Sequence, residues 1–200
     1  MNSTLDLDSA ITALASGVVV AVPTDTVYGL AASLRREEAI STLFALKRRP
    51  PSVPTPVLVH SVQQIEELGV EVDERTRDLA RAFWPGALTI VVAAPSSLAA
   101  LVRSDSDAVG FRIPRDALLG RLLERSDPLA VTSANRHGEP PCTKASEVLS
   151  QFDGHAGFGG VLDDGDRQGV VSTVIDVSTS DWRVLREGAI PIEAIQACLD

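Results

Sequence analysis

The first candidate for chemistry is a group of small polar residues that directly follows an apolar segment. Residues 18–22 are apolar, and Thr24, Asp25, Thr26 and Tyr28 come after them. Open α/β sheets present hydroxyls and carboxylates to ligands in this way, at the carboxyl ends of buried strands. The same residues also suit an ordinary turn in which Thr24 or Asp25 is a cap. The segment therefore predicts either a ligand-binding strand end or a capped turn.

A second apolar segment ends in the same way. Leu129–Val131 leads into Thr132, Ser133 and Asn135, with the small Ala134 before the asparagine. These side chains supply hydrogen-bond donors and acceptors, and the alanine allows a ligand to approach the backbone closely. A turn or a helix cap would also account for any one of them.

Two further strand-like segments carry a cation or a titratable ring. Arg112 lies within Val109–Pro114, and strand alternation places it on the face opposite to its apolar neighbours. An arginine in this position pairs with a carboxylate, which belongs either to the protein or to a ligand. His60 closes the short apolar strand Val57–Val59, a position that suits a ligand contact as well as a surface or structural histidine.

The densest basic cluster of the chain is Lys47-Arg48-Arg49. Cations at the C-terminus of a helix complement its dipole and cap its last carbonyls, which would explain the cluster without a ligand. Three in a row exceed that need, and Pro50 turns the chain out of the helix. The cluster therefore also predicts a phosphate-binding site.

Two polar residues near the C-terminus complete the set of candidates. Ser172 lies within the strand-like segment 170–177, and Arg186 follows the segment 182–185, where a surface charge is the alternative. Together, the strand ends carry hydroxyl, amide, imidazole and guanidinium groups. Such a set suits a small ligand with carboxylate, hydroxyl and phosphate groups.

Several common signatures are missing from the sequence. There is no G-x-x-x-x-G-K-[ST] phosphate loop, no G-x-G-x-x-G after a strand and no G-x-S-x-G elbow. The histidines at 60, 137 and 155 lack metal-ligand spacing, so no protein metal site is predicted. Any active site must therefore consist of polar groups at the ends of secondary-structure elements.

Size, charge and cysteine content limit the classes of function. The 200 residues are 44% hydrophobic, which suits one globular domain, and the net charge of −9 disfavours non-specific binding of nucleic acid. Cys142 and Cys198 form no motif, which suggests a reducing compartment. The sequence has neither a signal-peptide pattern nor an apolar run near the ~20 residues of a membrane span. We therefore expect a cytoplasmic protein without contact to a membrane.

Segments of helical and of strand-like periodicity alternate along the chain, which predicts an α/β fold. The six glycines within 153–169 predict a mobile loop there. No linker or repeat divides the chain, so we expect one domain over residues 1–200. Helices are expected before Gly17 and at 37–47, 62–68, 73–83, 117–124, 144–152 and 191–199, and strands at 18–22, 57–59, 87–93, 108–113, 129–131, 170–177 and 182–185.

Taken in order, eight short motifs resemble those of the YrdC-like family. The principal members of that family are threonylcarbamoyl-AMP synthases, which supply the activated intermediate for the N6-threonylcarbamoyl modification of adenosine in tRNA. The resemblance covers residues 10 to 190, and the order of the motifs is highly specific. The motifs are PTDTVYGL, K-x-R-P from Lys47, FWPG from Phe83, ALTIVV, FRIP, TSAN, STVID from Ser172 and LREG from Leu185.

The resemblance implies a single catalytic domain, in which helices flank a twisted mixed β-sheet around a central cleft. It also implies a nucleotidyltransferase that uses L-threonine, bicarbonate and ATP, with Mg²⁺ assisting. By motif position, the threonine side of the site would be Thr26, His60, Arg112, Thr132 and Ser172. The ATP side would be Lys47, Arg49, Ser133, Asn135, Thr143 and Arg186, with Lys47 and Arg49 as the catalytic pair.

In the implied reaction, a carbamate of threonine attacks the α-phosphorus of ATP and expels pyrophosphate, and the product passes to the tRNA threonylcarbamoyl-transfer machinery. The chain departs from the usual pattern in a longer segment 51–56, in His137 and in Val171. One alternative is a sister enzyme that acts on another small molecule. Another is an RNA-binding module of the same fold, against which the charge of −9 and the lack of interleaved aromatic and basic residues count.

Overall fold

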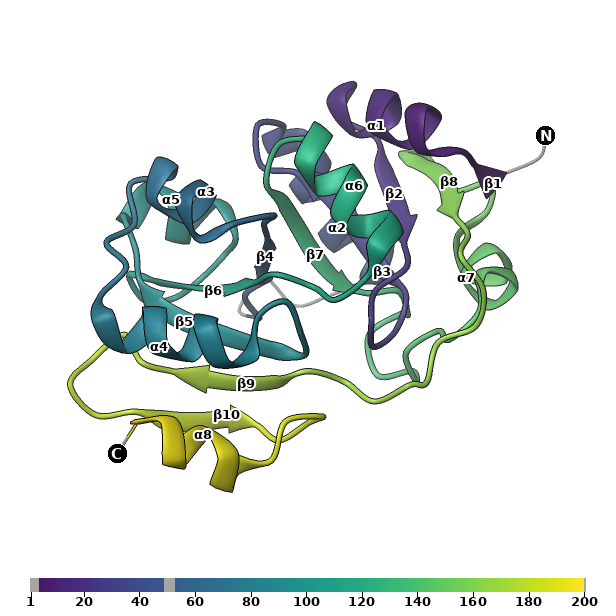
Figure 1. Cartoon of the computed structure of the whole chain (residues 1–200). Helices are drawn as coiled ribbons and strands as arrows, with labels where there is room; N and C mark the ends of the chain where they lie inside the picture. Colours follow the sequence, from purple (N-terminus) through teal and green to yellow (C-terminus); the bar gives the residue numbers. More distant parts are fainter. Residues whose placement is uncertain (1–3, 49–52, 200) are drawn as a thin grey trace.

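The computed structural model describes residues 4–48 and 53–199. Its strands form one mixed sheet in the order β1-β8-β2-β3-β7-β4-β6-β5-β9-β10, with helices packed around it (Figure 1). The strands are β1 (Thr4–Leu5), β2 (Val19–Val22), β3 (Gly29–Ser33), β4 (Val57–Leu58), β5 (Leu88–Ala93), β6 (Ala108–Arg112), β7 (Leu129–Ser133), β8 (Phe158–Leu162), β9 (Thr173–Asp176) and β10 (Arg183–Arg186).

Helices cover both faces of this sheet. In Figure 1, α1 and α6 lie together above β2, β3 and β7, whereas α4 and α8 lie along the edge formed by β9 and β10. The helices are α1 (Leu7–Ala15), α2 (Glu37–Lys47), α3 (Val62–Glu67), α4 (Glu74–Phe83), α5 (Ser96–Leu101), α6 (Ala117–Arg125), α7 (Ala145–Phe152) and α8 (Ile192–Leu199).

Strand alternation divides the apolar residues between two cores. In β2, Val19 and Ala21 belong to the larger core, whereas Val20 and Val22 belong to the core beneath α1 and α6. Successive side chains of a strand point to opposite faces, so an uninterrupted apolar strand is buried on both sides. This arrangement holds β2 rigidly at the point where it delivers Thr24–Thr26.

Aspartate caps begin three of the helices. Asp6, Asp73 and Asp116 each accept a hydrogen bond from the backbone N–H three residues further on, which starts α1, α4 and α6. Burial raises the pKa of Asp116, while the Leu119 N–H and the nearby Arg167 oppose that shift. The Asp116 carboxylate therefore lies where burial disfavours its charged form unless hydrogen bonds and a cation compensate.

The predicted α/β architecture is confirmed, although β1, β3, α5 and β8 were not among the predicted elements. Residues 158–162, which the glycines predicted to be part of a mobile loop, form β8, and this strand pairs in parallel with both β1 and β2. Residues 29–33 form β3 although their small side chains have weak strand propensity. In both cases pairing within the sheet outweighs local preference. In the described part of the chain, no helix is long and apolar enough to cross a membrane.

The core beneath α1 and α6 gives a test of stability. Leu122 of α6 is fully buried there. We expect Leu122→Ala to lower the free energy of unfolding by about 2–5 kcal/mol, because it leaves a cavity that the surrounding elements cannot fill. The neighbouring Arg121 is exposed, and Arg121→Ala should change stability by less than about 0.5 kcal/mol. Urea denaturation followed by circular dichroism measures both, and equal losses would contradict this packing.

Candidate functional site

Several predicted strand ends meet at one cavity of about 190 Å³. Thr24 and Thr26 line it after β2, Arg112 lines it at the end of β6, and Ser133 lines it at the end of β7. The wall is completed by residues of β5 and of the segment that precedes β9. The cavity therefore unites residues that lie more than a hundred positions apart in the sequence.

Thr24 fixes the segment that follows β2. Its hydroxyl donates to the carbonyl of Val27 at 2.7 Å and accepts from the backbone N–H groups of Thr26 and Val27 at 3.1 and 3.2 Å. The hydroxyls of Thr24 and Thr26 lie 2.8 Å apart. The segment is therefore a turn closed by Thr24, and Thr24 and Thr26 also line the cavity, so its ligand-binding role stays a prediction.

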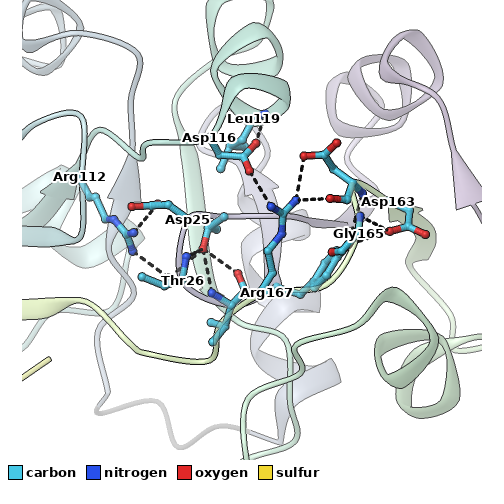
Figure 2. A network of polar contacts seen from close by, with 12 residues as sticks. Asp25, Thr26, Arg112, Asp116, Leu119, Asp163, Gly165 and Arg167 are labelled. Carbon is cyan, nitrogen blue, oxygen red and sulfur yellow. Dashed lines mark hydrogen bonds and ion pairs between the residues drawn. The ribbon is translucent and has the colours of Figure 1, made fainter. Parts of the chain in front are cut away.

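Arg112 is buried, with 6% of the residue exposed, and three acceptors hold its guanidinium. Nε donates to the carbonyl of Gly86 at 2.9 Å, Nη1 to the hydroxyl of Thr26 at 3.3 Å, and Nη2 to Oδ1 of Asp25 at 2.5 Å (Figure 2). Burial lowers the pKa of Arg112, and the ion pair with Asp25 opposes that shift. The predicted carboxylate partner thus belongs to the protein, but the arginine still faces the cavity.

Arg186 and Ser172 also form part of the cavity wall. Arg186 donates from Nε to the carbonyl of Ser172 at 3.0 Å and from Nη2 to its hydroxyl at 2.9 Å. The Ser172 hydroxyl lies 3.1 Å from that of Thr89 on β5. Arg186 is an exposed residue, which agrees with its interpretation as a surface charge. It also lines the cavity, where it holds Ser172 in place.

Lys47 is buried behind Ser133 at the end of α2. Its Nζ donates to the carbonyl of Ser133 at 2.6 Å, to the carbonyl of Asn135 at 2.8 Å and to Oδ1 of Asn135 at 3.0 Å. Asn135 in turn donates from Nδ2 to the carbonyls of Arg136 and Glu139. The lysine therefore joins the end of α2 to the polar end of β7 and carries its charge next to the cavity wall.

Residues 163–170, which we call the strap, run past the cavity between β8 and β9. Gly169 donates its N–H to the carbonyl of Thr26 at 3.1 Å, and Arg167 donates its own N–H to the carbonyl of Thr143 at 2.8 Å. The Arg167 guanidinium forms ion pairs with Asp116 at 3.2 Å and Asp164 at 3.1 Å (Figure 2). The strap is thus tied both to the start of α6 and to the turn that holds Thr26.

Tyr28 also anchors the strap, through its hydroxyl. Its hydroxyl lies 2.8 Å from Oδ1 of Asp163 and 2.9 Å from the carbonyl of Gly165. Burial raises the pKa of Tyr28 to about 12, so the hydroxyl keeps its proton at neutral pH and can donate to either acceptor. The guanidinium of Arg167 lies 5.7 Å from the centroid of the tyrosine ring. The second half of the predicted mobile loop is therefore held by several side chains.

The structure brings most of the predicted site residues together. Lys47 and Asn135 lie directly behind the cavity, whereas Thr143 contacts the strap and bonds Glu147. Arg49 lies outside the described residues. The predicted residues that line the cavity are Thr26, Arg112, Thr132, Ser133, Ser172 and Arg186.

His60 lies apart from this group. The chain leaves the sheet after β4, where Val59 donates its N–H to the carbonyl of Arg112 at 3.1 Å. His60 comes next and is exposed beside Pro85 and Ile113, and its N–H bonds the side chain of Gln64 in α3. The start of α3 thus carries the imidazole away from the cavity, and the binding role of His60 stays a prediction.

Sequence reasoning missed several residues that shape the site. Asp25 was considered as a ligand group at a strand end or as a cap, but not as the partner of Arg112, although a buried arginine needs a carboxylate. Thr89 carried a usable signal, since it is a polar residue within an otherwise apolar strand. Arg167 gave no local signal, because its main partner Asp116 belongs to a distant element.

A second, more apolar hollow of about 250 Å³ adjoins the cavity. The two share Pro56, Thr89 and Arg186 in their walls. Thr55 also lines the hollow, and among the described residues its buried hydroxyl has no hydrogen-bond partner.

The described residues do not supply a protein-built metal site. Among residues 4–48 and 53–199, no group of three or more histidine, cysteine, aspartate or glutamate side chains could hold an ion. The one carboxylate paired with Arg112 at the cavity, Asp25, is already engaged by that cation.

Comparison with known proteins gives a consistent match. A protein-family model described as "Telomere recombination" (Sua5_yciO_yrdC) matches residues 12–188. A threonylcarbamoyl-AMP synthase of Pyrococcus abyssi is 37% identical over 182 residues, which are 90% of this chain and 53% of that protein. A putative threonylcarbamoyl-AMP synthase of Mycobacterium tuberculosis is 38% identical over 192 residues, which are 96% of this chain and 88% of that protein.

Solved structures agree with these matches. The structure of P. abyssi Sua5 complexed with L-threonine has a TM-score of 0.90 and 35% identity, and the match covers 96% of this chain and 57% of that one. Escherichia coli YciO, at 19% identity, shares the fold with a TM-score of 0.84 over 94% of this chain and 92% of that one. The chain thus spans about half the length of the P. abyssi relative and most of the mycobacterial one.

Gly188 tests the wall formed by Ser172 and Arg186. A Cβ at this position would lie 2.6 Å from the carbonyl oxygen of Ser172, so the backbone must shift to accept it. We expect Gly188→Ala to destabilise the protein by about 1–3 kcal/mol and to weaken ligand binding. The control is Gly120→Ala in α6, where no atom lies within 4 Å and helix propensity should stabilise by up to about 1 kcal/mol. Thermal denaturation of both variants provides the measurement.

Proposed function

The chain belongs to the Sua5/YciO/YrdC family, the YrdC-like family that its motifs predicted, and we propose that it is a threonylcarbamoyl-AMP synthase. The proposed reaction forms threonylcarbamoyl-AMP and pyrophosphate from L-threonine, bicarbonate and ATP. The observation that carries the proposal is the cavity at the strand ends, where a buried arginine and several hydroxyls meet. The similarity to a Sua5 complexed with L-threonine supports the same ligand for this cavity.

The chemistry of the cavity suits a hydroxy amino acid. Arg112 presents its guanidinium for the carboxylate, and two of its five N–H groups remain beyond the bonds it makes within the described part of the chain. Thr26, Thr132 and Ser172 offer hydroxyls within the same wall. A site built to bond a ligand hydroxyl rejects the analogue that lacks it, because its own polar groups are then left unpaired. Valine should therefore be a poor substitute for threonine.

The volume of the cavity limits which of the proposed substrates it could hold. At about 190 Å³, it is smaller than the roughly 300 Å³ at which pockets for drug-sized ligands begin. It can accept an amino acid but not a nucleotide as well. The adjoining apolar hollow offers room for the nucleoside of ATP. Arg186, which lines both, would stand near the junction of the two substrates.

The proposed transfer needs alignment and charge neutralisation rather than a protein nucleophile. The amine of threonine combines with CO₂ derived from bicarbonate, and a carbamate oxygen then attacks the α-phosphorus of ATP while pyrophosphate leaves in line. Lys47 and Arg49 would neutralise the phosphates, with Lys47 held in place by Ser133 and Asn135. Mg²⁺ would enter as part of the ATP substrate. The product would then pass to the machinery that transfers threonylcarbamoyl to tRNA.

The direct test follows pyrophosphate release with ATP, bicarbonate and each amino acid in turn. We expect release with L-threonine and little with L-valine, because the cavity hydroxyls need a partner. Mass spectrometry should identify threonylcarbamoyl-AMP. Release with a different amino acid would indicate a sister enzyme. No release with any amino acid, together with salt-dependent RNA retention on filters, would indicate an RNA-binding module and overturn the proposal.

Arg112 should act mainly on threonine binding. We expect Arg112→Ala to raise the apparent KM for threonine by ~10-fold or more at saturating ATP, since it removes a charge-assisted bond to the carboxylate. Arg121→Ala on the exposed face of α6 is the matched control and should leave KM unchanged. An unchanged KM for Arg112→Ala would place the carboxylate elsewhere. Steady-state kinetics across threonine concentrations decide this point.

Arg49 should act mainly on the chemical step. We expect Arg49→Ala to lower threonine-dependent pyrophosphate release by ~10²-fold or more, the scale on which loss of a charge-stabilising donor reduces rates. Single-turnover measurements at saturating substrates separate this loss from weaker binding. Release near the wild-type rate would refute a catalytic role for Arg49.

A further inference from the structure

Asp25 lies between two residues of the cavity wall, Thr24 and Thr26, and its carboxylate meets the guanidinium of Arg112 (Figure 2). The two side chains are largely withdrawn from solvent, with 14% of Asp25 and 7% of Arg112 exposed. A buried charge is costly unless it is paired, so Arg112 needs an anion at all times, including when no ligand is present. Asp25 provides that anion.

The same guanidinium is the group offered to a ligand. Nε and Nη1 already donate to Gly86 and Thr26, and Nη2 donates to Asp25. A ligand carboxylate on the second N–H of Nη2 would come within roughly 5 Å of Asp25, since a new hydrogen bond to that nitrogen would be about 2.9 Å long. Two carboxylates that share one cation repel each other. The ligand and Asp25 therefore compete for the same positive charge.

We propose that Asp25 is an internal substitute for the ligand's carboxylate. It neutralises Arg112 in the empty cavity and lowers the affinity of the site for incoming carboxylates. Asp25 is thus an affinity-determining residue rather than a catalytic one. The inference rests on the proposed function only for the identity of the ligand, which is an amino acid. The competition itself applies to any small carboxylate that reaches Arg112.

A second ion pair offers a matched control. Asp116 and Arg167 are similarly buried, at 4% and 13% exposed, and are joined at 3.2 Å. Their side chains lie on the strap and at the start of α6, outside the wall that Arg112 forms. Asp116→Asn removes a charge from a buried pair, as Asp25→Asn does, and keeps an oxygen that can cap α6. Arg167 keeps its ion pair with Asp164 in that variant, so the stability loss should be the smaller of the two. Both variants should lose stability, but only one should change carboxylate binding.

The experiment titrates sodium acetate, and separately L-threonine, into the wild type, Asp25→Asn and Asp116→Asn at constant ionic strength, and follows the melting temperature. Acetate probes the carboxylate site without an amine or a hydroxyl. We expect Asp25→Asn to melt at a lower temperature without ligand and to bind acetate at least ~10-fold more tightly than the wild type, because the competing charge is gone. Asp116→Asn should bind acetate with the wild-type affinity.

An acetate affinity of Asp25→Asn that equals or falls below the wild-type value would overturn the inference. If Asp25→Asn does not fold, the double variant Asp25→Asn/Arg112→Gln decides. Removing both charges should restore folding, since no unpaired charge then remains, whereas an unfolded double variant would contradict the neutralising role. Tighter acetate binding by Asp25→Asn, with no threonine binding by any form, would uphold the inference and count against the proposed function instead.

Discussion

The buried charge of Arg112 constrains the centre of this protein more than any other single group. Its acceptors come from the turn after β2 and from Gly86 before β5. In the sheet, the strands β3, β7 and β4 lie between β2 and β6, so the turn after β2 brings Asp25 to an arginine of a strand that is not its neighbour. A guanidinium held from separate parts of the chain cannot turn without loss of several bonds. The hydrogen bonds that stabilise this buried charge therefore also fix the shape of the cavity wall.

Thr26 links this charge to the strap. Its hydroxyl accepts from Arg112, its carbonyl accepts from the N–H of Gly169, and its backbone is fixed by Thr24. The strap is held in turn by Arg167, which pairs with Asp116 at the start of α6. A ligand that forms a hydrogen bond with the hydroxyl of Thr26 would thus contact a residue that Arg112, Gly169 and Thr24 already hold in place. Such a residue can be positioned accurately because its neighbours leave it few alternatives.

Local sequence patterns predicted the parts of the structure that depend on local physics. The apolar runs before Thr24 and Thr132 marked strands correctly, and the polar tips of those strands do meet at one cavity. Pairing that depends on distant partners was missed: β3 and β8 are rich in small residues, and the sheet rather than their propensity makes them strands. The sequence predicted that a carboxylate would pair with Arg112, but not that this carboxylate belongs to Asp25. The position of the His60 side chain outside the cavity wall could not be predicted, because nothing in its own segment indicates the direction that the chain takes into α3.

The balance of charge near the cavity is compatible with the proposed binding of small anions by an acidic chain. Lys47, Arg112 and Arg186 stand at or directly behind its wall, and Asp25 is the carboxylate paired among them. The chain as a whole carries a net charge of −9. At long range this charge repels polyanions, while at short range the local cations attract a carboxylate or a phosphate that is small enough to enter. A polynucleotide backbone meets the long-range field first, whereas an amino acid or a nucleotide is affected mainly by the pocket. Discrimination by size and by charge thus arises from one arrangement.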